Sequence, residues 1–224
     1  MEQLDIKTLE KKAFRSFFKD GIYDLFWGLI LLSFGLPLIF QEFGWIDYVT
    51  ITMPLLIPLI LNVSALLFFI FGKKYITVPR LGIAHFGKTR KRKLKHVKLL
   101  LAVSVLIGAI VFFLSLFKVF PVGGTSGIPL PFLIFGIQSL LILSFIAYFM
   151  DFTRLYLYAF LFAISLPLTF WLKRNTELHY PSLWVFTFTT VPVLVIGCVV
   201  FIQFLTRFPI RKELRVGNEQ TKEK

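Results

Sequence analysis

The feature that most constrains this chain is a set of six apolar runs, each about as long as a membrane-spanning helix. They cover residues 21–40, 48–71, 97–119, 129–150, 155–172 and 183–204. An α-helix crosses the hydrocarbon core of a bilayer in about 20 residues. Because the runs are continuously apolar, without the alternation of barrel strands, they predict helices. We therefore expect an all-α integral membrane protein with six transmembrane helices, arranged as a plain bundle or as three helical hairpins.

Composition excludes the soluble classes. Apolar residues make up 57% of the 224 positions and charged residues 17%, against about 45–50% and about 25% in soluble domains. A soluble fold of this length could not bury so much apolar surface. The single cysteine, Cys198, excludes an intramolecular disulfide and a cysteine-based metal cluster.

The distribution of Lys and Arg predicts the orientation. Of the 25 basic residues, 22 fall in the N-terminal segment, between the second and third runs, at Arg154 and in the C-terminal tail. The opposite connections contain only Lys118, Lys173 and Arg174. Since cytoplasmic segments carry the excess of Lys and Arg, both termini are predicted to be cytoplasmic.

Three regions follow from this pattern. Residues 1–20 have apolar residues at helical spacing, including Ile6, Leu9, Ala13 and Phe17, which predicts an amphipathic helix lying in the cytoplasmic interface; a solvated extension is the alternative. Residues 21–206 form the transmembrane domain, with a basic cytoplasmic loop at 73–96. Residues 207–224 form a basic cytoplasmic tail.

Small residues mark the predicted contacts between helices. Gly21, Gly28 and Gly35 are spaced seven apart along the first run, and Ser104 and Gly108 share a face of the third. In lipid, helices associate where small side chains allow the backbones to approach closely. We expect these five residues to face neighbouring helices.

The sequence offers no complete catalytic centre. The string Gly124-Thr125-Ser126-Gly127 resembles the short nucleophile signature of rhomboid proteases, and that resemblance implies a histidine base in the sixth helix. The sixth run has no histidine, and a serine nucleophile needs a base within hydrogen-bond reach. The lone histidines also lack partners at metal-ligand spacing. The sequence therefore favours a non-enzymatic protein with no catalytic residues, metal or cofactor.

The loop between the second and third runs carries more charge than its length requires. Residues 75–82 are predicted to be an ordered, partly extended stretch, because Val78 precedes Pro79 and Gly82 permits a turn. Six cations then occur within residues 88–95, on a segment expected to be helical. We expect Arg80, Lys91, Arg92 and Lys93 to bind anionic lipid headgroups or a membrane or cytoplasmic protein partner. The alternative is a purely topogenic signal. Nucleic acid is disfavoured because no aromatic residues interleave the charges.

Two functions remain open from the sequence. One is a multi-pass membrane protein that acts through lipid or partner contacts on its basic cytoplasmic face. The alternative is a transporter of a small neutral or lipidic solute, whose site needs no buried charge. The Pro79-Arg80-x-Gly82 and Arg154-x-Tyr156-x-Tyr158 strings together resemble prokaryotic membrane proteins without an assigned activity. That resemblance implies the plasma membrane of a prokaryote and no particular function.

Overall fold

The computed structural model describes residues 18–45, 52–82, 88–117 and 130–209. The predicted interfacial helix at 1–20 and the basic tail at 207–224 therefore lie almost entirely outside the described residues. So do residues 83–87 of the basic loop.

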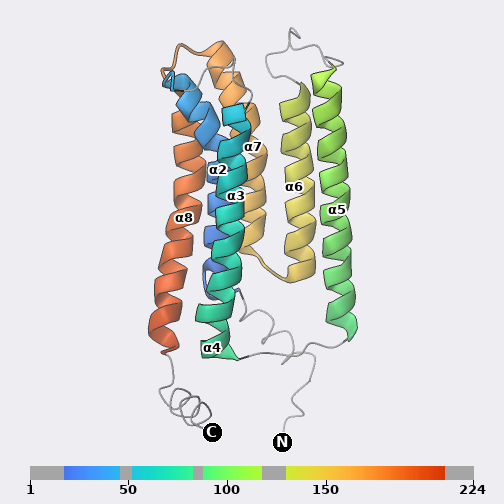
Figure 1. The fold of residues 1–224 in the computed structure, drawn as a ribbon, viewed down its shortest axis with the longest axis vertical. Helices are drawn as coiled ribbons and strands as arrows, with labels where there is room; N and C mark the ends of the chain where they lie inside the picture. The colour runs from blue at the N-terminus through green and yellow to red at the C-terminus, as the bar shows by residue number, and fades with distance from the viewer. Residues whose placement is uncertain (1–17, 46–51, 83–87, 118–129, 210–224) are drawn as a thin grey trace, which may run out of the picture.

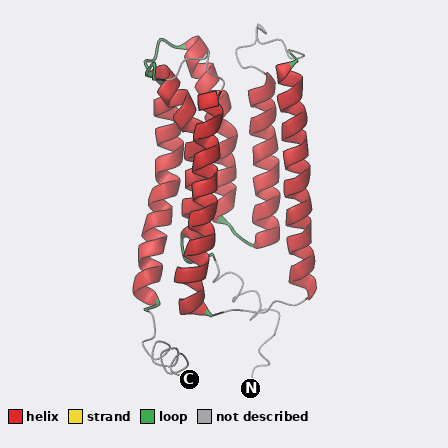
Figure 2. Cartoon of the chain, viewed as in Figure 1, coloured by secondary structure: helices red, strands yellow, loops and turns green. Residues whose placement is uncertain are grey.

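Six long helices make up the described part of the chain, which contains no strand (Figure 2). Each is long and apolar enough to cross a membrane, so the prediction of an all-helical, six-span membrane protein is confirmed. The helices are α2 (Ile22–Glu42), α3 (Thr52–Gly72), α5 (Lys88–Leu116), α6 (Leu130–Met150), α7 (Arg154–Asn175) and α8 (Pro181–Arg207). A π-helical turn, η1 (Lys73–Thr77), and a short helix, α4 (Val78–Leu81), continue α3 without a break.

Helix α2 packs against both α3 and α8 (Figure 1). The most extensive packing joins α6 to α7, α7 also contacts α8, and α5 packs chiefly on α6 at the edge of the bundle. Helix α2 begins and α8 ends at the same end of the bundle, where α4 also lies. We call this end, which carries Lys73, Arg80, Arg154 and Arg207, the basic end.

Glycines lie where neighbouring helices come closest, α2 against α8 and α6 against α7. A Cβ added to Gly28 would lie 2.5 Å from Leu194 of α8, and one added to Gly35 would overlap the ring of Phe186. A Cβ at Gly136 would lie 2.6 Å from the Ala163 carbonyl oxygen, which brings α6 equally close to α7. Side chains larger than hydrogen would push these helices apart, and close approach is a main source of stability for helices in lipid.

Gly21 and the small residues of α5 differ in their surroundings from the three glycines above. Gly21 has a left-handed backbone (φ 73°), and a Cβ there would lie 2.6 Å from the Gly197 carbonyl oxygen. No atom lies within 4 Å of a Cβ added to Gly108. Gly108 borders a cavity, and Ser104 borders the same cavity while it contacts Gln138 of α6.

The extended stretch predicted over residues 75–82 is wrong, because the chain stays helical through Leu81. A proline ring collides with the carbonyl of the residue four before it in a regular α-helix. The π-turn avoids this clash with longer hydrogen bonds, such as the one from the Val78 N–H to the Lys73 carbonyl. Pro79 then occupies the first turn of α4, where its missing N–H costs nothing. The turn expected at Gly82 is present, with φ 79°.

Candidate functional site

Two buried aspartates, Asp20 just before α2 and Asp24 in its first turn, lie at the basic end. Asp20 is fully buried, and its Oδ2 accepts hydrogen bonds from Lys73 Nζ at 2.6 Å and from Thr77 Oγ1 at 2.6 Å. Its Oδ1 accepts from the Ile22 N–H at 3.2 Å. Asp20 therefore gives a partner to the first N–H group of α2, which lacks one within the helix, and connects the start of α2 to η1.

Asp24 makes the corresponding connection to α7. Its carboxylate, also fully buried, accepts from Arg154 Nη1 at 2.6 Å and from the Tyr158 hydroxyl at 2.7 Å. Arg154 Nη2 donates in turn to the Phe18 carbonyl oxygen at 2.9 Å. Paired charges therefore connect the start of α2 to two segments that are far away in the sequence, η1 and α7.

Aromatic rings lie against both cations of this cluster. Lys73 Nζ lies 4.6 Å from the centroid of the Tyr23 ring, and the Arg154 guanidinium carbon lies 5.4 Å from that of Phe152. Phe18 stacks on Phe152 with a centroid separation of 5.1 Å. Cations over ring faces in this way are stabilised by the ring quadrupole.

Each charge in this paired-charge cluster has an opposite charge at hydrogen-bond distance. A chemical centre needs a group free to bind substrate or exchange a proton with it. The ion pairs instead connect the start of α2 to η1 and to α7. Asp24 could be singled out from the sequence as an ionisable residue inside a span, but its partners are 130 and 134 positions away.

A cavity of about 780 Å³ lies between α4 and the end of α8. Arg80 and Arg207 both line it, and none of the described residues that line it is acidic. Arg80 Nη1 donates to the Ile76 carbonyl oxygen at 2.9 Å, while its buried Nε has no hydrogen-bond partner among the described residues. Two positive charges at one cavity, without a carboxylate among its described lining residues, favour an anion.

The other basic residues expected to bind lipid lie elsewhere. Arg92 is exposed on the first turns of α5, where helix was predicted, and the side chain of Lys91 is outside the described set. Lys93 lines a separate polar cavity of about 370 Å³ together with Asp151, Tyr148 and Tyr156. Neither Arg92 nor Lys93 lines the cavity that holds Arg80.

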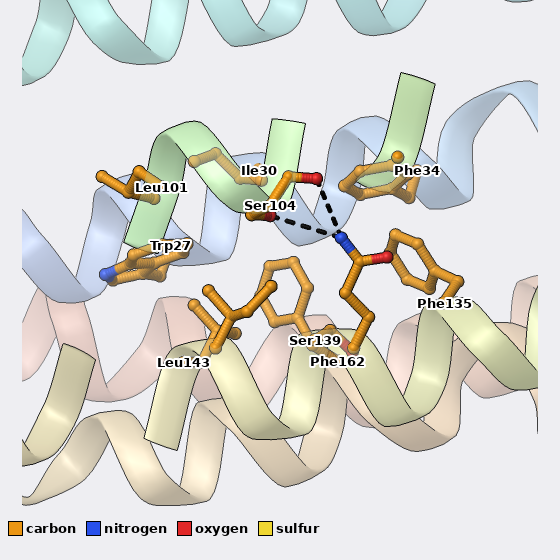
Figure 3. Close-up of a pocket in the computed structure, with 12 residues that line it drawn as sticks. Trp27, Ile30, Phe34, Leu101, Ser104, Phe135, Ser139, Leu143 and Phe162 are labelled. Carbon is orange, nitrogen blue, oxygen red and sulfur yellow. Dashed lines mark hydrogen bonds between the residues drawn. The ribbon is translucent and has the colours of Figure 1, made fainter. Parts of the chain in front are cut away.

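A third cavity, of about 280 Å³, lies halfway along the helices between α2, α5, α6 and α7 (Figure 3). Its walls are mostly aromatic and aliphatic, with Trp27, Phe34, Phe135 and Phe162 among them. Gln138 of α6 contacts α5, where its Nε2 donates to the Ser104 carbonyl oxygen at 2.9 Å. No sequence pattern indicated this cavity.

Metal-binding groups are absent from the described ranges, in which no three His, Cys, Asp or Glu side chains come together. Cys198 is exposed on α8.

The fold and these sites define a six-helix membrane protein with a basic, ion-paired end. No family model, curated protein or solved structure matches the chain. Its function must therefore be inferred from its own geometry.

Proposed function

We propose that this protein is a non-enzymatic, multi-pass membrane protein that binds anionic lipid headgroups at its basic end. The observation that carries the proposal is the shared cavity of Arg80 and Arg207, which no acidic residue of the described ranges lines. Arginine pairs well with phosphate because its planar guanidinium can donate two parallel hydrogen bonds.

The basic end is proposed to face the cytoplasm of a prokaryotic cell, where the leaflet attracts juxtamembrane cations. The 22-to-3 distribution of Lys and Arg supports this orientation. Single cysteines introduced into a Cys198→Ser background test it with a membrane-impermeant thiol reagent. Residues 122–127 should react in intact cells and residues 88–95 only after lysis; the reverse pattern refutes the orientation.

Two finer features belong to the same proposal. Residues 1–20 would lie in the cytoplasmic interface as an amphipathic helix and add to the attraction for anionic lipid. The six helices would correspond to three hairpins, α2–α3, α5–α6 and α7–α8, each of which consists of consecutive, contacting helices.

Lipid titration of the purified protein tests the headgroup site. In a neutral detergent, phosphatidylglycerol should raise the melting temperature more than phosphatidylcholine, because a ligand that binds only the folded state stabilises it. Each arginine contributes about 1 kcal/mol near an anionic surface. The Arg80→Gln/Arg207→Gln variant should therefore bind phosphatidylglycerol about 30-fold more weakly.

Arg92→Gln/Lys95→Gln is the matched control, because it removes two exposed positive charges that do not line this cavity. It should lower the affinity by about fivefold at most. Equal losses in the control and the Arg80/Arg207 variant would mean that the attraction is diffuse. An unchanged lipid preference in the Arg80/Arg207 variant would refute the site and leave a protein partner as the candidate for this surface.

Transport of a small neutral or lipidic solute is a second candidate function, favoured by the cavity between α2, α5, α6 and α7. No charged residue lines this cavity, which suits a neutral cargo. Exchange of a labelled neutral solute across proteoliposomes would test transport, and a rate equal to that of empty liposomes would refute it for that solute.

A further inference from the structure

We propose that the cavity between α2, α5, α6 and α7 binds a neutral, lipid-soluble molecule that carries a hydroxyl group. This site is distinct from the arginine-lined cavity at the basic end and does not depend on the headgroup proposal. Its volume of about 280 Å³ is close to the lower limit of ligand pockets, about 300 Å³. A molecule of about ten carbon atoms would fill it.

The apolar walls of the cavity favour a ligand with an apolar, uncharged body. The ring of Trp27 meets that of Phe162 edge-on at 6.0 Å, and the rings of Phe34 and Phe135 lie 5.3 Å apart. These contacts, from three different helices, hold the rings in fixed positions around the cavity. Since no ionisable residue lines the cavity, a charged ligand would lose its hydration without a compensating partner.

The amide of Gln138 favours a ligand that carries a hydroxyl group. Its Nε2 donates to the Ser104 carbonyl oxygen at 2.9 Å and approaches Ser104 Oγ at 3.4 Å. Both of these contacts use the nitrogen, and among the described residues no donor reaches the Oε1 atom. An amide oxygen at this depth cannot rely on water for a partner. A ligand hydroxyl would supply the missing donor.

Small residues on α5 leave the space for this ligand. Gly108 borders the cavity, and no atom lies within 4 Å of a Cβ added there. A larger residue at this position would therefore extend into the cavity without meeting the backbone of a neighbouring helix. Leucine at Gly108 fills the site in the way that a bound molecule would.

Quenching of Trp27 fluorescence by brominated probes tests the proposal. Trp27 lines the cavity, and a variant with only this tryptophan is made by replacing three exposed tryptophans with phenylalanine: Trp45, Trp171 and Trp184. The probes are 6-bromohexanol and 1-bromohexane, which differ by one hydroxyl group. Their micellar concentrations are matched by their quenching of tryptophan octyl ester in the same detergent.

Saturable quenching is expected, with half-saturation at a roughly fivefold to tenfold lower concentration for the alcohol, as expected for one hydrogen bond. Gln138→Leu should remove this difference, and Gly108→Leu should abolish saturable quenching by both probes. Ala109→Leu introduces the same side chain at an α5 residue that does not line the cavity, and should leave quenching unchanged.

Three results would overturn the inference. Equal saturable quenching by both probes would show a site for any apolar chain, without selection of a hydroxyl. Non-saturable quenching that matches the octyl ester would show partition into the micelle only. Saturable quenching that persists in Gly108→Leu would place the probe elsewhere. Should Gly108→Leu not be recovered folded, the comparison of the intact site with Gln138→Leu decides between these outcomes.

Discussion

Replacing Lys73 with methionine tests whether the paired-charge cluster holds the basic end together. Lys73 is 7% exposed and Asp20 is fully buried, and their charged atoms are 2.6 Å apart. Methionine keeps most of the length and the apolar part of the lysine side chain. The substitution therefore removes the positive charge and leaves the Asp20 carboxylate buried with only neutral hydrogen-bond donors from Thr77 and Ile22.

Removing one partner of a buried ion pair costs about 3–5 kcal/mol. For a chain of this size, that loss corresponds to a fall in melting temperature of about 6–20 °C. Thermal unfolding in a mild detergent, followed by circular dichroism, measures the shift. Lys74→Met is the matched control, because Lys74 is the next residue in the same turn and is exposed; its effect should stay within about 0.5 kcal/mol.

The double variant Asp20→Asn/Lys73→Met separates loss of the pair from loss of packing. Asparagine carries no charge, and its amide oxygen still accepts a hydrogen bond. The double variant should therefore recover about 2 kcal/mol relative to Lys73→Met alone. If Lys73→Met unfolds at the temperature of Lys74→Met, or if the double variant is the less stable one, the reasoning about the cluster is refuted.

Gly28→Leu should lower the free energy of unfolding by about 1–3 kcal/mol, because its side chain would displace Leu194 on α8; an unchanged melting profile in detergent would contradict this contact. Tyr158→Phe should cost about 1.5–3 kcal/mol through loss of the hydroxyl donor to the Asp24 carboxylate, and an effect below 0.5 kcal/mol would mean that Arg154 alone satisfies that carboxylate. Glu42→Leu should cost about 1 kcal/mol, because the Glu42 carboxylate accepts hydrogen bonds from the backbone N–H and the hydroxyl of Ser182 at the start of α8. Amide hydrogen exchange in the first turn of α8 should become faster, and equal protection in both proteins would argue against this cap.

The six helices could be predicted because each depends on a local property, the length of an apolar run. The helix bounds in the structure differ from the ends of the apolar runs by a few residues, except at the start of α5, which begins at Lys88, within the segment predicted to be helical and nine residues before the apolar run. That difference has a physical cause: lysine and arginine are good helix formers, so a helix can begin well outside the apolar run that it continues.

The functional sites could not be predicted in the same way because they depend on pairs of distant residues. Asp20 and Asp24 are four residues apart, a spacing that is visible in the sequence. Their partners, Lys73 and Arg154, are equally visible as basic residues at the ends of spans, but the orientation rule accounts for such residues without any pairing. Only the packing of α3 and α7 against α2 brings the opposite charges together.

The extended stretch expected at 75–82 failed for a related reason. The preference of Val78 for an extended backbone is a local bias, whereas the structure gains a continuous helix that brings Thr77 to Asp20. The sequence signal that could have indicated this outcome is the apolar and aromatic character of residues 75–78, which continues the second span.

The π-turn at Lys73–Thr77 also sets how this segment tolerates a change in length. Such a turn holds one more residue than the α-helix around it requires. Deleting the exposed Lys74 would remove that extra residue and let the turn close into a regular α-helix, in which each N–H bonds to the carbonyl four residues before it. Because the wide turn already accommodates the extra residue, the residues after it would keep nearly the same rotational phase. The Pro79 ring would, however, meet the carbonyl that the wider turn spares. A single-codon deletion here would therefore cost a clash at Pro79, whereas substitution of the same lysine leaves the wide turn intact.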